Sequence, residues 1–138
     1  MVDRGALESR ARRIDAELEV LEHARTGGRE PYLRNRSLQR EVERALEVSI
    51  QACIDIGAHL VAVWGLGVPE DYADVFERLS REDELDRGLA ERMKEAAGQR
   101  NMLVHVYLDI DHMKIWDKLG EVDDLRAFAR WALEEAGR

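Results

Sequence analysis

The chain has 138 residues, of which 45% are hydrophobic and 36% are charged, so it is long enough to bury a core of its own. Its formal charge of −8 argues against a protein that binds nucleic acid through net charge, so an RNA contact would need a local basic patch. Apolar residues recur with helical spacing throughout, which argues against a disordered chain.

The first predicted helix covers residues 3–25, where apolar residues form one narrow stripe. Two glycines, Gly27 and Gly28, predict its end, and Pro31 predicts that residues 26–36 form a loop. The first forty residues carry nine arginines against seven acidic residues, so this region is the candidate for a positive surface.

A longer helix is predicted over residues 37–65, with Ser37 as its N-cap. Its apolar residues cover more than one face, which is typical of a central helix or of a subunit contact. The apolar stretch 56–66 is interrupted by His59 and is too short to span a bilayer, so we expect no membrane association. Asp55 and His59 are expected to pair along the helix, and Cys53, the single cysteine, is expected to be a buried, reduced thiol in a cytoplasmic protein.

Further helices are predicted over residues 70–80, over 85–107, after Ile110, and from Val122 to Leu133. No stretch alternates with the period of a strand, and no repeat or linker divides the chain. The sequence therefore predicts an all-α, up-and-down bundle of four to five main helices, with residues 1–138 as a single domain.

The stretch 100–107, Arg-Asn-Met-Leu-Val-His-Val-Tyr, places four polar side chains close together in an otherwise apolar segment. On an ideal helix, Arg100 and Tyr107 share a face, and Asn101 and His105 share a neighbouring face. Arg100 and His105 differ by about 140°, so one helix alone is a poor active site. The spacing therefore favours a site completed by a second subunit.

The residue types suit cleavage of RNA phosphodiesters. His105 can exchange a proton near neutral pH, and Arg100 can hold a phosphate through two hydrogen bonds. The 2′-hydroxyl of RNA is a built-in nucleophile, so neither a metal nor a protein nucleophile is required.

Two other interpretations remain open from the residues alone. The cluster is also typical of a hydrogen-bonded polar seam in a helical core. Alternatively, His105, Asp109 and His112 fall on one helical face and have the spacing of ligands for a divalent cation.

The Arg100-x₄-His105-x-Tyr107 pattern resembles the signature of the HepT-like toxins, which belong to the HEPN group of helical ribonuclease domains. The resemblance extends to the segment 45–56 and to the Tyr72-x₃-Phe76-x₂-Leu79 pattern, and it covers residues 5–133.

This resemblance implies a homodimer whose two signatures meet in a cleft and cleave RNA, such as tRNA or mRNA, without a metal or other cofactor. It implies catalytic roles for Arg100 and His105, a supporting role for Asn101, and Tyr107 as an acceptor of AMP. The implied partner is a cognate minimal nucleotidyltransferase antitoxin, which silences the toxin by AMPylation of Tyr107. The alternative is a non-catalytic helical module that binds such a nucleotidyltransferase or presents a substrate to it.

Overall fold

The computed structural model describes residues 1–81, 85–104 and 110–137, without the side chain of Val104. Within them, the elements in chain order are α1 (Arg4–Gly27), α2 (Arg29–Arg34), α3 (Arg36–Val63), α4 (Tyr72–Ser80), α5 (Arg87–Val104), α6 (His112–Lys118), the short 3₁₀ helix η1 (Leu119–Glu121) and α7 (Asp123–Glu135).

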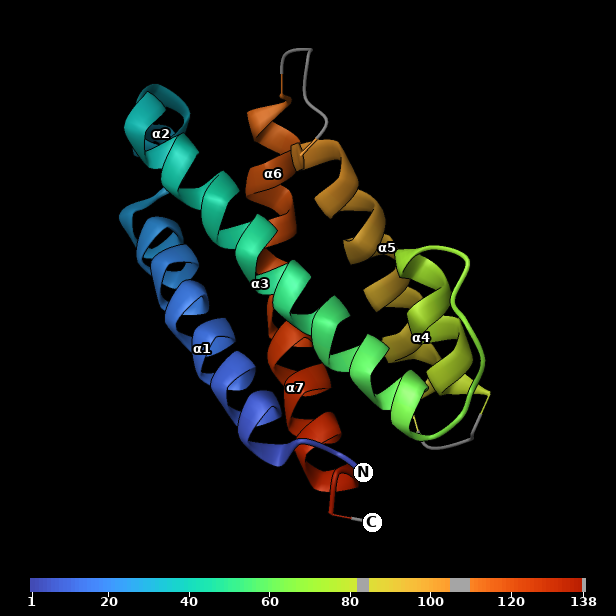
Figure 1. Cartoon of the computed structure of the whole chain (residues 1–138). Helices are drawn as coiled ribbons and strands as arrows, with labels where there is room; N and C mark the ends of the chain where they lie inside the picture. Colours follow the sequence, from blue (N-terminus) through green and yellow to red (C-terminus); the bar gives the residue numbers. More distant parts are fainter. Residues whose placement is uncertain (82–84, 105–109, 138) are drawn as a thin grey trace.

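The helices form a bundle in which α3 is central. It packs against α1, α4, α5 and α7, and α1 also packs against α7 (Figure 1). The two ends of the chain lie at the same end of the bundle, where α1 begins and α7 ends (Figure 1). The predicted all-α bundle is confirmed, with α1, α3, α4, α5 and α7 as its main helices.

The central position of α3 follows from its composition. Apolar residues on more than one of its faces are buried, including Ile50, Ile54 and Leu60. At 28 residues, α3 is long and apolar enough to cross a membrane by length and composition. The sequence prediction considered only the shorter stretch 56–66. However, 56% of its most apolar window is buried inside the bundle, as in the core helix of a globular fold.

The chain between α1 and α3 differs from the prediction, because residues 29–34 form α2 rather than a loop. Pro31 is compatible with this helix because it lies in the first turn, where backbone N–H groups lack a partner within the helix. Gly28, with φ of 100°, separates α1 from α2. The proline therefore marks the start of a short helix.

Two local predictions on α3 have different outcomes. Cys53 is fully buried, as expected, and its Sγ lies 3.7 Å from the carbonyl oxygen of Leu125. The expected Asp55–His59 pair is wrong: His59 Nε2 accepts a hydrogen bond from the backbone N–H of Asp3, and Asp55 lies 3.8 Å from Arg10.

Candidate functional site

The site is built on α5, which brings Arg100 to the side of the bundle that faces α4. The helix starts after Asp86, whose carboxylate accepts a hydrogen bond from the Leu89 N–H at 2.9 Å. Ala90, Met93 and Ala97 form its buried stripe. Arg100 continues this stripe three residues after Ala97, so an arginine occupies a position where the helix otherwise carries core residues.

Arg100 is half-buried and contacts an aromatic ring instead of a carboxylate. Its guanidinium carbon lies 5.2 Å from the centroid of the Tyr72 ring, at the first residue of α4. Its Nε is fully buried and has no hydrogen-bond partner, and Arg100 makes no salt bridge to any residue that the structure describes. Because a buried donor without a partner is costly, Arg100 is a candidate for binding an anion.

Asn101 has an exposed side chain directly after Arg100. The next residue, Met102, is 73% exposed, whereas Leu103 packs partly against the core. His105 and Tyr107 lie outside the described residues. Of the four predicted site residues, the structure therefore places Arg100 and Asn101, which are consecutive on α5. The prediction that Arg100 shares one helical face with Tyr107, and Asn101 another with His105, stays untested.

An ion-pair network holds α4 against α5 beside the site. Lys94 of α5 lies between Glu77 of α4 and Glu91 of its own helix. The hydrogen bond with Lys94 lowers the pKa of Glu77, and the same contact raises the pKa of Lys94. Both groups therefore stay charged across the physiological range and fix the two helices relative to each other.

The candidate metal set is placed only in part. His105 and Asp109 lie outside the described residues, and His112 lies in α6 with its Nδ1 3.6 Å from the Glu43 carboxylate of α3. No group of three His, Cys, Asp or Glu side chains gathers within residues 1–81, 85–104 and 110–137.

Two other reactive side chains serve the core. Burial raises the pKa of the Cys53 thiol far above neutrality, so it is not a nucleophile under ordinary conditions. Burial, with a smaller contribution from Glu43, raises the pKa of Tyr32 to about 12. Tyr32 packs against Trp116 and His112, at ring-centroid distances of 5.5 and 6.2 Å.

Three hollows on the surface of the described residues are not lined by Arg100. The smallest, of about 40 Å³, is lined from α5 by Arg92, Ala96 and Gln99. One of about 390 Å³ is lined by residues of α1 and α7, including Arg4, Asp15 and Arg126. Another of about 300 Å³ is lined by residues of α1 and α3, including Arg10 and Arg44. Since Arg100 lines none of the three, these hollows do not provide a substrate cleft for it.

Tyr72 is the site residue that sequence reasoning missed. The sequence marks it as an apolar position of the helix over residues 70–80 and as part of the Tyr72-x₃-Phe76-x₂-Leu79 pattern, but assigns it no role. Its contact with Arg100 depends on how α4 packs against α5, and no local pattern around either residue carries that information. The available signal was the register of α5, in which Arg100 falls on the buried stripe and therefore requires a partner or a function.

The solved structures of HEPN toxins share this fold. The tri-AMPylated Shewanella oneidensis HEPN toxin, solved in complex with MNT antitoxin, superposes with a TM-score of 0.85 at 23% identity, covering 95% of this chain and 97% of that chain. The molecule therefore has the helical-bundle fold of that toxin.

Sequence comparison identifies the family. The model of the family described as ribonuclease HepT-like matches residues 14–131, and the chain belongs to this family. It is 30% identical over 110 residues to the tRNA nuclease HepT of Aphanizomenon flos-aquae, covering 80% of this chain and 75% of that protein. It is 32% identical over 75 residues to the mRNA nuclease HepT of Shewanella oneidensis, covering 54% of this chain but only 56% of that relative.

Proposed function

We propose that this chain is the toxin of a HEPN–minimal nucleotidyltransferase toxin–antitoxin pair and that it cleaves RNA without a metal ion. The observation that carries the proposal is the family match over residues 14–131, combined with an Arg100 whose buried Nε has no hydrogen-bond partner among the described residues. The names of the two relatives, an mRNA nuclease and a tRNA nuclease, support RNA as the substrate class and make tRNA and mRNA the candidate targets.

The proposed cleavage uses the substrate's own nucleophile. The 2′-oxygen of RNA attacks the adjacent phosphorus and loses its proton to a base, while the 5′-oxygen leaves and receives a proton from an acid. The products are a 2′,3′-cyclic phosphate and a 5′-hydroxyl. His105 is the proposed proton carrier, Arg100 stabilises the charge that develops on the phosphoryl oxygens, and Asn101 supports them.

The proposal includes a homodimer with a composite site. The cleavage needs both a base and an acid, and the signature of one chain supplies a single histidine, His105. Because Arg100 lines none of the three hollows on the described residues, an RNA cleft beside Arg100 requires a second surface. A second copy would contribute that surface and a second histidine.

Silencing by AMPylation is the regulatory part of the proposal. The phenol oxygen of Tyr107 attacks the α-phosphorus of ATP on the cognate nucleotidyltransferase, a phosphate ester of AMP forms, and pyrophosphate leaves. A bulky anion on Tyr107 would compete with RNA phosphate for Arg100. Both proteins would act in the cytoplasm, where ATP and RNA are available.

Cleavage of total tRNA in the presence of EDTA tests the activity. We expect the purified protein to cut RNA with EDTA present and to leave cyclic phosphate ends, and we expect His105→Ala to abolish cutting at unchanged helicity. If the wild-type protein does not cut any RNA but Tyr107 is still modified, the chain is a non-catalytic module for a nucleotidyltransferase. Cutting that EDTA abolishes would instead support a metal-dependent enzyme.

Mass spectrometry of the protein co-expressed with a neighbouring nucleotidyltransferase tests the regulation. We expect the mass to increase by one or more AMP units, with fragments that assign them to Tyr107. Tyr107→Phe is the matched control, because it keeps the ring and removes the acceptor oxygen. An equal mass increase on the Tyr107→Phe variant would place the modification elsewhere.

A further inference from the structure

The Tyr72 ring is the group that contacts the Arg100 guanidinium, at 5.2 Å from centroid to guanidinium carbon. A ring face attracts a cation through its quadrupole and does not consume N–H donors at the edge of the guanidinium. A carboxylate partner would occupy those donors, and Arg100 has no such partner among the described residues. The contact therefore holds the charge without occupying the N–H donors of Arg100.

Tyr72 itself is fixed by the start of α4. The preceding residue, Asp71, caps the helix by accepting a hydrogen bond from the Asp74 N–H at 2.7 Å. The Asp74 carboxylate accepts two further hydrogen bonds, from the Glu70 N–H at 3.0 Å and from Arg78 Nε at 2.8 Å. The chain on both sides of Tyr72 is therefore restrained by hydrogen bonds.

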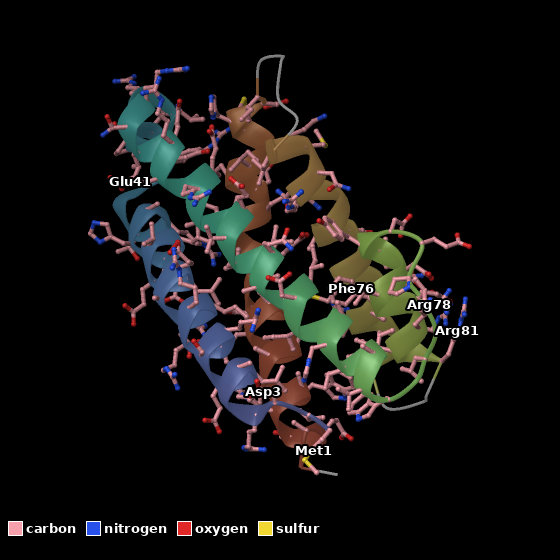
Figure 2. All side chains as sticks on the ribbon, viewed as in Figure 1. Met1, Asp3, Glu41, Phe76, Arg78 and Arg81 are labelled. Carbon is pink, nitrogen blue, oxygen red and sulfur yellow. The ribbon has the colours of Figure 1, made fainter. Side chains whose placement is uncertain are left out.

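The loop before α4 is tied to the same network. Arg78 Nη1 donates to the carbonyl oxygen of Leu66 at 2.9 Å, so one guanidinium connects the loop to the helix. Arg78 and Arg81 lie at the outer edge of α4, whereas Phe76 lies within the bundle (Figure 2). The outer side of α4 thus anchors the loop, while its inner side packs.

The packing of the inner side of α4 fixes the position of Tyr72 relative to α5. Val75, Phe76 and Leu79 are buried, and the Phe76 ring packs edge-on against Phe128 at 5.1 Å. A Cβ at Gly57 of α3 would lie 2.7 Å from Val75 Cγ1, so the close approach of α3 and α4 requires glycine there. These contacts leave α4 little freedom to move away from Arg100.

We infer that Tyr72 is a positioning residue for the proposed ribonuclease reaction, whose ring holds the Arg100 guanidinium in the orientation that meets the scissile phosphate. The inference rests on the proposed function of Arg100. Tyr72 is 38% exposed, so its ring lies at the surface where a substrate phosphate would approach. It acts through Arg100 and does not itself touch the reacting atoms.

Kinetics of three Tyr72 variants test this role. Tyr72→Leu keeps an apolar side chain but removes the ring, and we expect kcat to fall about 2- to 30-fold, the range of a cation–π contact. KM for RNA should stay within about twofold. Tyr72→Phe should restore wild-type kcat, and Tyr72→Trp should equal or exceed it, because the ring face is the active feature.

A double-mutant cycle separates positioning from a structural role. If Tyr72 acts through Arg100, the Tyr72→Leu change lowers the residual rate of the Arg100→Ala protein no further. Val68→Ala is the control, because Val68 is 83% exposed in the loop before α4. Losses that multiply in the double variant, or a Tyr72→Phe protein as slow as Tyr72→Leu, would overturn the inference.

The Arg100 Nε–Hε signal in ¹⁵N–¹H NMR tests the contact without any activity. In the wild-type protein we expect this signal to be shifted by the ring current and protected from solvent exchange, and both properties should disappear in Tyr72→Leu. If the signal behaves so but no RNA is cut, the proposed function fails while the contact stands. An Arg100 signal that Tyr72→Leu leaves unchanged overturns the inference even in an active enzyme.

Discussion

Two arginines, Arg78 of α4 and Arg100 of α5, use their guanidinium groups differently. Arg78 is only 20% exposed, and it donates to the Asp74 carboxylate and to the Leu66 carbonyl. Arg100 is also partly buried, but its buried Nε has no partner among the described residues and its face contacts the Tyr72 ring. The donors of Arg78 are used to fix a loop, whereas those of Arg100 are not used in this way by the described residues, as the proposed binding of a phosphate requires.

The largest expected effect comes from removing each arginine in turn. Arg100→Ala should lower kcat for RNA cleavage about 10²- to 10³-fold, as for the loss of a group that stabilises transition-state charge. Its Tm should change by no more than about 2 °C, because the change also removes a buried donor without a partner.

The matched variant is Arg78→Ala, for which the opposite result is expected. Stability should fall by about 1–3 kcal/mol through the lost hydrogen bonds to Asp74 and Leu66, which is a drop of about 3–10 °C in Tm. The kcat of the folded protein should fall much less than in Arg100→Ala. If Arg100→Ala unfolds the protein while Arg78→Ala abolishes activity, the two assignments are reversed.

A pair of glycines in the loop before α4 sharpens the structural half of the comparison. Gly65 and Gly67 both have positive φ, 67° and 94°. A Cβ at Gly65 would meet nothing within 4 Å, whereas a Cβ at Gly67 would meet the Arg78 guanidinium. Gly65→Ala should therefore cost about 1 kcal/mol of backbone strain, and Gly67→Ala about 2–3 kcal/mol because it also displaces Arg78.

Urea unfolding of the two glycine variants measures this difference, provided that the m-value stays constant. Equal losses of stability would mean that Arg78 moves aside freely and that its hydrogen bonds do not hold the loop. A larger loss for Gly65→Ala would contradict the arrangement of the loop itself.

The helices were predictable because their signals are local. The stripe of α1 and the several apolar faces of α3 follow directly from residue spacing. The helix α2 was missed because Pro31 is a breaker within a helix but is tolerated in a first turn.

The contacts of the site were less predictable because they join distant segments. Asp55 and His59 have the spacing of a helical pair, but each finds another partner, Arg10 and the Asp3 backbone respectively. The meeting of Arg100 with Tyr72 likewise depends on the packing of α4 on α5. A sequence pattern thus selects Arg100 as a candidate, while only tertiary structure identifies the ring that holds it.

The smallest expected effect concerns the acid that Arg78 binds. The hydrogen bond from the Glu70 backbone, with a further contribution from Arg78, holds the pKa of Asp74 below its usual value. Because the pKa is lower in the folded state, the carboxylate stabilises the protein above its unfolded pKa of about 3.9, and this contribution is lost as the pH falls through the folded pKa.

Asp74→Asn should therefore cost at most about 1 kcal/mol at pH 7, and its difference from the wild-type protein should shrink below about pH 4. Urea unfolding at a series of values from about pH 2.5 to about pH 7, below and above the unfolded pKa, measures this convergence. Asp117→Asn is the control, because the Asp117 side chain is exposed and makes no hydrogen bond or salt bridge with the described residues. If the free energies of unfolding of Asp74→Asn and the wild type instead differ by the same amount at every pH, the charge of the Asp74 carboxylate does not hold Arg78. In that case the contrast between Arg78 and Arg100 in the use of their donors fails.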